Sequence, residues 1–376
     1  MRRDRSSRIA VVGAGPAGCF VVLEILKKIP DATIDLYDKR PTPYGLVAYG
    51  VAPDHCRTRR ILKVLDGAIT HPKVTFHPDT IIGEAPHAVA DLLHTHRAVI
   101  LCTGAEIPVT LDVPGRDGPD LPIWSGLDFA YWANGHPSPP FPVVDAPKVV
   151  VVGHGNVALD AARLLARPPE TLRETDIAPQ ALRQLERMQT KTITLLGRRG
   201  PAQSKFGPEE LREIAESDLW NVDVREEDLV LTPEEIAWQE ANPHHPHVFN
   251  LETFRSMVGR KIKPGLSTIA FRFHTRVTRI VSPLQITVET GPDQHTAMDY
   301  NLLIEAIGHR ARPIPGLPFD EARSILPHQA GRVEGSPGVY TSGWLKRGAT
   351  GLIGHNRKDA IETVSCLFDD WNNGVI

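Results

Sequence analysis

Two runs of β-branched and other apolar residues, at positions 9–12 and 149–152, each lead directly into a glycine-rich turn. A helical pattern of apolar positions follows each turn, so the chain is predicted to form a strand, a tight turn and a helix twice. The first unit continues with a predicted strand over Thr33–Tyr37, and the second with one over Thr192–Leu196. Strands that alternate with helices in this way predict an α/β fold with parallel sheets.

Both turns have the residue spacing of a dinucleotide-binding fingerprint. The first has Gly13, Gly15 and Gly18 in the pattern Gly-x-Gly-x-x-Gly, and the second runs from Gly153 in the pattern Gly-x-Gly-x-x-Ala. The glycines permit a tight turn and a close approach of the backbone to a pyrophosphate, which the N–H groups of the following helix can hold. Two such turns predict two bound dinucleotides, and electron transfer between them is the simplest function.

The residues that follow the second strand of each unit differ in charge. Asp38 lies 20 residues after Gly18, where a carboxylate can accept hydrogen bonds from both hydroxyls of an unphosphorylated adenosine ribose. At the matching place the second unit has Arg198 and Arg199, whose guanidinium groups suit a ribose 2′-phosphate. The first site therefore fits FAD or NAD and the second fits NADP, and we predict one FAD and one NADPH.

A third glycine-rich segment lies near the C-terminus. Residues 339–343 are a predicted short strand, and Gly351, Leu352 and Ile353 open a helical pattern that continues over 357–371. N–H groups at such a helix start could stabilise negative charge on a reduced flavin ring. A plain connection between a strand and a helix explains the glycines equally well.

A faint internal repeat predicts the domain organisation. Residues 99–108 and 302–313 each read as a strand that ends in glycine and is followed by proline, as expected where a chain passes between domains. We therefore predict two Rossmann-like dinucleotide-binding domains, as in glutathione-reductase-like flavoproteins. An FAD domain formed by 1–105 and 306–376 would contain an inserted NADP domain over 106–305.

Other stretches carry weaker patterns. Proline and glycine punctuate 40–51, which we expect to be a loop, whereas 57–68 is predicted to be one helix. Residues 169–189 are expected to be a largely helical excursion within the second domain. Residues 232–263 show no clear period and are expected to be irregular.

Composition narrows the classes of function. The 376 residues are 41% hydrophobic and 23% charged with a net charge of −3, so the chain as a whole offers no footprint for nucleic acid. No apolar run approaches the roughly 18–20 residues that a membrane helix requires. The N-terminal arginines lead straight into the first strand, so no secretory signal is expected. Cys19, Cys56, Cys102 and Cys366 form no Cys-x-x-Cys pair, which argues against a redox dithiol or iron–sulfur cluster and favours the cytoplasm.

Taken together, the motifs resemble adrenodoxin reductase and the bacterial NADPH–ferredoxin reductases of that type, over about residues 8–370. The resemblance is carried by segments 12–18, 42–47, 50–55, 155–160, 197–201 and 343–348. Trp344 in the last of these distinguishes the chain from glutathione-reductase-like enzymes, which usually carry Asp after the late glycine. Asp38 stands where the family usually has Glu, a difference of one methylene that need not change the contact.

The resemblance implies roles for individual residues. FAD would be contacted by Ala17, Asp38, Leu46, Ile82, Trp344, Gly351, Leu352 and Ile353. NADP would be bound by His154, Gly155, Asn156 and Val157 at the pyrophosphate, by Arg198 and Arg199 at the 2′-phosphate, and by Glu210 and Gly351. His55 and Glu213 match a family pair near the nicotinamide that assists proton movement and ring positioning. Without the resemblance, His55 would be interpreted as a structural loop histidine.

The expected partner is a small acidic iron–sulfur ferredoxin. Seven basic residues could steer such a partner by charge: Arg255, Arg260, Lys261, Lys263, Arg272, Arg276 and Arg279. An ordinary solvated surface explains these residues equally well. His244, His245 and His247 lack the spacing of metal ligands, and no metal site is expected.

The leading hypothesis is an FAD-dependent NADPH–ferredoxin reductase. Hydride would pass from NADPH to flavin N5, and single electrons would then pass to the ferredoxin. The alternatives are a flavin-dependent monooxygenase and a redox sensor that binds flavin and NADPH without turning over.

Overall fold

The computed structural model describes residues 7–84, 87–137, 145–245, 248–291 and 293–376. The chain divides into two compact units. The first comprises Met1–Val51, His55–Ile107 and Gly308–Ile376, and the second comprises Ala52–Asp54 and Pro108–Ile307. The sequence-based division placed all of 1–105 in the first domain, so the assignment of Ala52–Asp54 to the second unit is a difference between the two.

The first unit is built on a seven-stranded sheet with the order β16-β17-β18-β4-β1-β2-β3. The strands from β18 to β3 run parallel, and β16 and β17 add an antiparallel edge. β1 has β2 on one side and β4 on the other, and ligands of such sheets bind where the strand order reverses. The strands are β1 (Arg8–Val12), β2 (Thr33–Tyr37), β3 (Val74–His77), β4 (Ala98–Leu101), β16 (His328–Gln329), β17 (Arg332–Val333) and β18 (Val339–Thr341).

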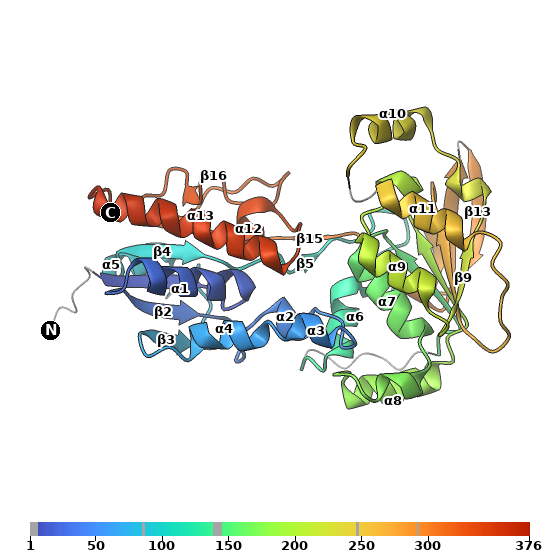
Figure 1. Ribbon diagram of the computed structural model, residues 1–376, viewed down its shortest axis with the longest axis horizontal. Coiled ribbons are helices and arrows are strands. Elements are labelled where there is room, and N and C mark those ends of the chain that lie inside the picture. Colours follow the sequence, from blue (N-terminus) through green and yellow to red (C-terminus); the bar gives the residue numbers. More distant parts are fainter. Residues whose placement is uncertain (1–6, 85–86, 138–144, 246–247, 292) are drawn as a thin grey trace. The chain divides into compact units, whose positions relative to one another are not determined.

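Helices cover this sheet on the face where α1 and α13 pack side by side (Figure 1). Alternate residues of β1 point to opposite faces, so Ile9 and Val11 join the core under these helices, and Ala10 and Val12 join a second core. Both faces of the sheet are therefore buried. The helices are α1 (Pro16–Lys28), α2 (Leu46–Tyr49), α3 (Cys56–Arg59), α4 (Leu62–Ile69), α5 (Val89–Thr95), α12 (Trp344–Arg347) and α13 (Ile353–Asn372).

The second unit repeats this construction with a six-stranded parallel sheet in the order β6-β14-β7-β8-β10-β9. β7 lies between β8 and β14, as β1 lies between β2 and β4. A separate antiparallel sheet of β11, β12 and β13 accompanies it. The short strands β5 (Ile107–Pro108) and β15 (His309–Arg310) form a two-stranded sheet of their own and belong to neither of the large sheets. The strands are β6 (Ile123–Ser125), β7 (Lys148–Val152), β8 (Thr192–Leu196), β9 (Asn221–Val224), β10 (Thr268–Arg272), β11 (Arg276–Ser282), β12 (Gln285–Gly291), β13 (Gln294–Asp299) and β14 (Leu302–Glu305).

The helices of the second unit bury alanine-rich and aromatic faces in one large core. Phe206, Phe254 and Phe271 pack in this core with tilted or edge-to-face rings. The helices are α6 (Gly126–Ala133), α7 (Asn156–Ala166), α8 (Pro179–Met188), α9 (Pro208–Glu216), α10 (Pro233–Ala241) and α11 (Val248–Met257), with short 3₁₀ turns at Pro169–Leu172, Pro201–Gln203 and Glu227–Leu229.

Three of the weaker sequence-based expectations were wrong in detail. The expected loop 40–51 contains the one-turn helix α2, and the expected single helix 57–68 is interrupted between α3 and α4. The expected irregular stretch 232–263 contains both α10 and α11. α10 is nevertheless marked in the sequence, because Thr232 and Glu235 form a capping box and Pro233 occupies the first helical turn.

Gly18 provides a test of the first turn, because a Cβ placed on it would lie 1.8 Å from the carbonyl oxygen of Gly13. We expect Gly18→Ala to lower the free energy of unfolding by about 3 kcal/mol through steric overlap. A Cβ placed on Gly67 in α4 would meet no atom within 4 Å, so Gly67→Ala should stabilise the protein by roughly 0.5–1 kcal/mol. Urea unfolding measures the free energy of unfolding of both variants. Equal changes in Gly18→Ala and Gly67→Ala would contradict the close packing at Gly18.

Candidate functional site

The first glycine turn closes tightly against the end of a neighbouring strand. Gly13 has a φ of +101°, and a Cβ on it would lie 2.4 Å from the carbonyl oxygen of Cys102, directly after β4. Its N–H group donates to the carbonyl oxygen of Tyr37 at 2.8 Å. α1 then begins after Gly15, which has no side chain with which to cap the helix. The N–H groups of the first turn are thus suited to hold an anion.

Asp38 lies directly after β2 and is linked to the same turn. Its Oδ2 accepts a hydrogen bond from the Ala14 N–H at 2.7 Å, and its Oδ1 accepts one from the Arg40 N–H at 2.9 Å. Burial raises the pKa of Asp38, and the two N–H groups oppose this effect. Each carboxylate oxygen has a second lone pair, so both can still accept a hydrogen bond from a ribose hydroxyl. The geometry fits an unphosphorylated adenosine ribose.

The loop before α2 runs beside the first glycine turn. The Tyr44 N–H donates to the Ala14 carbonyl oxygen at 2.7 Å, and a Cβ on Gly45 would lie 3.2 Å from the Cα of Gly15. This close approach brings Leu46, the first residue of α2, near the turn. The sequence-predicted residues Gly13, Gly15 and Leu46 are thus gathered in one part of the first unit.

Segment 343–353 approaches the same helix start. Gly343 has a φ of +72°, and a Cβ on it would lie 2.5 Å from the Cβ of Ala17. The ring of the following Trp344 stacks on His309, with ring centroids 6.3 Å apart, and Trp344 and Ile82 pack against the same apolar cluster. The structure therefore places Ala17, a predicted flavin contact, against the residue that precedes Trp344.

The start of α13 has its own local hydrogen bonds. Gly351 has a φ of +81°, and the N–H of the exposed Leu352 donates to His355 Nδ1 at 3.0 Å. The Leu352 N–H is consequently engaged within its own helix turn. The role of Gly351, Leu352 and Ile353 at a flavin ring stays a prediction.

The second glycine turn repeats the first. Gly153 has a φ of +132°, and a Cβ on it would lie 2.2 Å from the carbonyl oxygen of Ala306, directly after β14. Its N–H group donates to the Leu196 carbonyl oxygen at 2.9 Å. In contrast, a Cβ on Gly155 would have open space around it. Steric limits within the chain therefore require glycine at position 153, whereas the space beside Gly155 can admit a ligand.

His154 is packed inside the second turn. Its ring lies against Gly197, where a Cβ would be 2.2 Å from His154 Nδ1, and it packs against Phe206 and Phe273. Nε2 lies 3.3 Å from the Leu195 carbonyl oxygen. Burial lowers the pKa of His154 to about 4, opposed by this hydrogen bond, so the ring is neutral at pH 7.

Asn156 and Glu210 are brought together through the loop before α9. Asn156 Oδ1 accepts a hydrogen bond from the Gly207 N–H at 2.7 Å. A Cβ on Gly207 would lie 1.8 Å from Glu210 Oε2, so the Glu210 carboxylate folds back over the start of its own helix. The Asn156 side chain thus fixes the entry to α9. Val157, the next residue, is 37% exposed and open to a ligand.

Arg198 and Arg199 are exposed in the loop that follows β8. Behind them lies a carboxylate that sequence reasoning missed: Glu235 is 2% exposed, and a Cβ on Gly200 would lie 1.6 Å from its Oε1. Glu235 Oε2 accepts the Thr232 N–H at 2.9 Å and lies 3.5 Å from His274 Nε2. The capping-box spacing Thr232-x-x-Glu235 was the sequence signal that could have located this residue.

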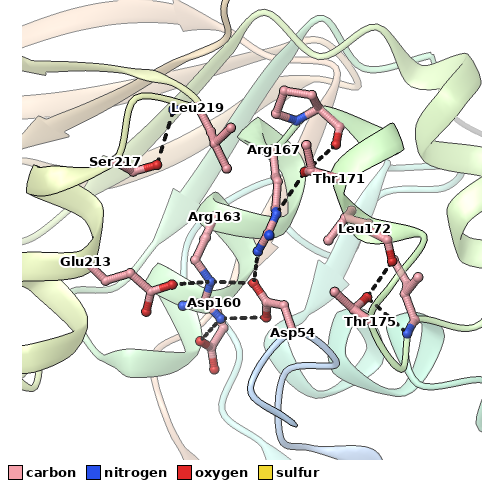
Figure 2. Close-up of polar contacts among 12 residues, drawn as sticks. Asp54, Asp160, Arg163, Arg167, Thr171, Leu172, Thr175, Glu213, Ser217 and Leu219 are labelled. Atoms are coloured by element: carbon pink, nitrogen blue, oxygen red, sulfur yellow. Dashed lines mark hydrogen bonds and ion pairs between the residues drawn. The ribbon is translucent and has the colours of Figure 1, made fainter. Parts of the chain in front are cut away.

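Glu213 lies on α9 beside a buried arginine from α7. Its Oε1 is 3.9 Å from Arg163 Nε, and the same Arg163 side chain makes a bidentate ion pair with Asp54 (Figure 2). His55 follows Asp54 in the chain. Sequence reasoning selected His55 and Glu213 but missed Arg163, although a charged residue four positions after Leu159 interrupts the apolar face of α7.

The remaining candidates from the sequence are distributed as follows. Three of the seven basic residues expected near a partner pair with carboxylates: Lys263 with Asp218, Arg272 with Asp223, and Arg276 with Glu289. His245 packs edge-to-face on Trp238, and His247 lies outside the described residues. Within the described ranges, no group of three His, Cys, Asp or Glu side chains could hold a metal ion.

The buried cysteines do not form a reactive group. Cys19, Cys102 and Cys366 are buried free thiols, and burial raises the pKa of Cys19 to about 12.

Among the helices of the described segments, none has both the length and the apolar character needed to cross a bilayer.

Comparison with known proteins agrees with the geometry. The chain is 36% identical to the NADPH-ferredoxin reductase FprA of Mycobacterium tuberculosis, an alignment that covers 97% of this chain and 84% of the relative. It is 32% identical to the mitochondrial NADPH:adrenodoxin oxidoreductase of Mus musculus, covering 100% of this chain and 80% of the relative. A scan against protein-family models found no match.

Solved structures give the same result. The structure of M. tuberculosis FprA in complex with NADPH superposes with a TM-score of 0.86 at 34% identity, covering 98% of this chain and 85% of that one. Thioredoxin reductase of T. acidophilum shares the fold alone, with a TM-score of 0.56 at 15% identity over 96% of this chain and 97% of that chain.

The fold is that of a flavoprotein with two dinucleotide-binding domains, which confirms the expected fold class. Within that class, the chain belongs to the adrenodoxin reductase-type NADPH–ferredoxin reductase family, as the sequence motifs indicated.

His154 generates a prediction about pH. Its pKa of about 4 in the folded protein lies below the usual value near 6.5, so the unfolded chain binds the extra proton between these two values. This contribution to stability is complete above pH 6.5 and is lost as the pH falls toward 4. Between pH 7 and pH 5, the free energy of unfolding should fall by about 2 kcal/mol more in the wild type than in His154→Phe.

Urea unfolding at the two pH values measures this difference. The exposed His295 on β13 supplies a control, since His295→Gln should retain the pH dependence of the wild type. An identical pH dependence in the wild type and in His154→Phe would show that the imidazole is not buried in the neutral form.

Proposed function

We propose that this chain is an FAD-dependent NADPH–ferredoxin reductase, and that FAD binds to the first unit and NADPH to the second. The observation that carries the proposal is the opposite charge at two equivalent places. A half-buried carboxylate, Asp38, follows β2, and two exposed guanidinium groups, Arg198 and Arg199, follow β8. Membership of the reductase family supports the same function.

At the FAD site, the backbone of the first turn would hold the pyrophosphate and Asp38 would orient the adenosine ribose. Leu46, Ile82 and Trp344 would exclude water from the ring system, and the start of α13 would meet its electron-rich edge. When bound, FAD supplies the change from two-electron to one-electron chemistry, which no protein side chain can provide.

At the NADPH site, the open space beside Gly155 and the exposed Val157 would receive the pyrophosphate at the start of α7. Arg198 and Arg199 would bind the 2′-phosphate with charge-assisted hydrogen bonds. The neutral ring of His154 fills the wall behind the turn, so it adds no charge there. Glu210 would contact the nucleotide from α9.

His55 and Glu213 would assist proton movement and orientation of the nicotinamide. Their side chains would supply a hydrogen-bond donor and a carboxylate beside the ring, where hydride transfer needs close positioning.

The partner of such an enzyme is an iron–sulfur ferredoxin, and we propose that it is small and acidic and that both proteins act in the cytoplasm. Exposed cations on the second unit include Arg255, Lys261 and Arg279. They would favour encounter with an acidic protein at low ionic strength.

Anaerobic titration tests the function. The purified protein is expected to be yellow, and NADPH should bleach the flavin absorbance at near-stoichiometric amounts, whereas NADH should do so far less readily. Steady turnover should follow when ferredoxin and a cytochrome acceptor are added.

Three results would contradict the proposal. A protein that remains colourless with added FAD would exclude a flavoprotein. Strong oxygen consumption stimulated by an organic substrate without ferredoxin would indicate a monooxygenase. Bound flavin that NADPH does not reduce would indicate a sensor.

Arg198 and Arg199 give a prediction about cofactor selectivity. Each phosphate contact contributes about 1.5–3 kcal/mol, so Arg198→Ala or Arg199→Ala should raise the KM for NADPH by roughly 10- to 100-fold. The KM for NADH should change little, because NADH lacks the 2′-phosphate. Steady-state kinetics with ferricyanide as acceptor measures both constants. Arg183→Ala, at an exposed site on α8, should leave both unchanged; an equal loss with NADH would contradict the assignment.

A further inference from the structure

Four charged residues of the second unit surround the buried side chain of Arg163, and we name these five residues together the Arg163 cluster (Figure 2). Arg163 Nε and Nη2 donate to the two oxygens of Asp54 at 2.8 and 2.9 Å, and Nη2 also donates to Asp160 at 2.9 Å. Arg167 Nη1 donates to Asp54 Oδ2 at 3.2 Å. Glu213 Oε1 completes the cluster at 3.9 Å from Arg163 Nε.

The cluster fixes a segment that is distant in sequence. Asp54 and Arg163 are 109 positions apart, and their side chains are 1% and 0% exposed. The two residues before Asp54 are held as well: Ala52 packs in the hydrophobic core of the second unit, and the Pro53 carbonyl oxygen accepts the Asp176 N–H at 3.1 Å. Segment Ala52–Asp54 is therefore attached at three consecutive residues.

Stability alone is a weak explanation for this arrangement. Burying two charges costs desolvation energy that their attraction only partly offsets, and apolar residues of similar size often serve as well. Arg163 stands on a face of α7 otherwise formed by Leu159, Ala162 and Ala166, where an aliphatic residue would complete the core. A side chain without solvent exposure also cannot itself touch a cofactor.

Arg163 is linked to both members of the proposed proton-transfer pair, to Glu213 directly and to His55 through the preceding residue, Asp54. On one side it holds the carboxylate of Asp54, whose main-chain carbonyl forms the peptide bond to His55. On the other side it is an ion-pair partner of Glu213, whose side chain is 46% exposed. The guanidinium group is planar and rigid, so it fixes the direction of each group it binds more strictly than an ammonium would.

We propose that Arg163 and Asp54 are positioning residues for the reductase reaction. Arg163, held by Asp54, fixes where the backbone enters His55 and how the Glu213 carboxylate lies, without contacting the nicotinamide. This inference rests on the proposed function, because it gives His55 and Glu213 their roles. No bond is made or broken at Arg163, and the residue keeps its proton throughout.

The experiment compares Arg163→Lys and Asp54→Asn with the wild type in the holoenzyme, with ferricyanide as acceptor. Both variants should lower kcat by about 10- to 100-fold, as expected when reacting groups are displaced by about 1 Å, and the KM for NADPH should stay within about threefold. The flavin content should be unchanged. Each variant is assayed well below its own unfolding temperature.

A matched control lies in the first unit. Asp370 is 4% exposed and makes a bidentate ion pair with Arg332, at 2.8 Å from Nε and 2.5 Å from Nη2. Asp370→Asn should lower the unfolding temperature without a comparable loss of kcat. If Asp54→Asn lowers kcat no more than Asp370→Asn does, the cluster is merely structural and the proposal is wrong.

A double-mutant comparison separates positioning from other effects. In a His55→Gln/Glu213→Gln background, Arg163→Lys should lower kcat by no more than about twofold, because the groups it positions are already absent. A full 10- to 100-fold further loss in that background would overturn the proposal. If Arg163→Lys fails to fold, Asp54→Asn in the same background decides by the same criterion.

The wild type distinguishes failure of this inference from failure of the proposed function. If NADPH does not reduce the wild-type flavin, the reductase assignment fails and the inference falls with it. If the wild type is reduced normally while both cluster variants keep the wild-type kcat, only the positioning role is excluded.

Discussion

The two proposed nucleotide sites depend on the same steric constraint, which occurs once in each unit. At the end of each central strand, a glycine lies against the carbonyl oxygen of the residue that follows the adjacent parallel strand: Gly13 against Cys102, and Gly153 against Ala306. A hydrogen atom fits there and a methyl group does not. Because the chain can turn so sharply, the helix that follows begins directly at the edge of the sheet, and its first N–H groups face the place where strand order reverses.

With the backbone alike in the two units, the selection of nucleotide passes to the residues after the next strand. Asp38 is held by two backbone N–H groups and retains acceptor capacity for a ribose. Arg198 and Arg199 extend from a loop that packs closely on the buried Glu235 through Gly200. The difference in charge between these loops, and not a difference in fold, is what would assign FAD to one unit and NADPH to the other.

The Arg163 cluster adds a second kind of constraint, because its ion pairs restrict the positions of Asp54 and Glu213. Hydride transfer asks little of protein side chains as acids or bases but requires that groups stay in place. Ala52–Asp54 belongs to the second unit although its neighbours in sequence belong to the first. The cluster explains how so short a segment is retained there.

The fold class, the two glycine turns and the contrast between Asp38 and the arginine pair could be predicted from the sequence, because the hydrophobic period, the glycine spacing and the charge at a strand end each lie within one strand–turn–helix–strand unit of the chain. The contacts between residues far apart in the sequence became visible only in the folded chain, which pairs Asp54 with Arg163 and places Glu235 against Gly200. It also gave helices to a stretch that shows no apolar period, because α10 and α11 gain their stability from caps and from packing. Such partners are chosen by the folded chain as a whole, and no local pattern of residues specifies them.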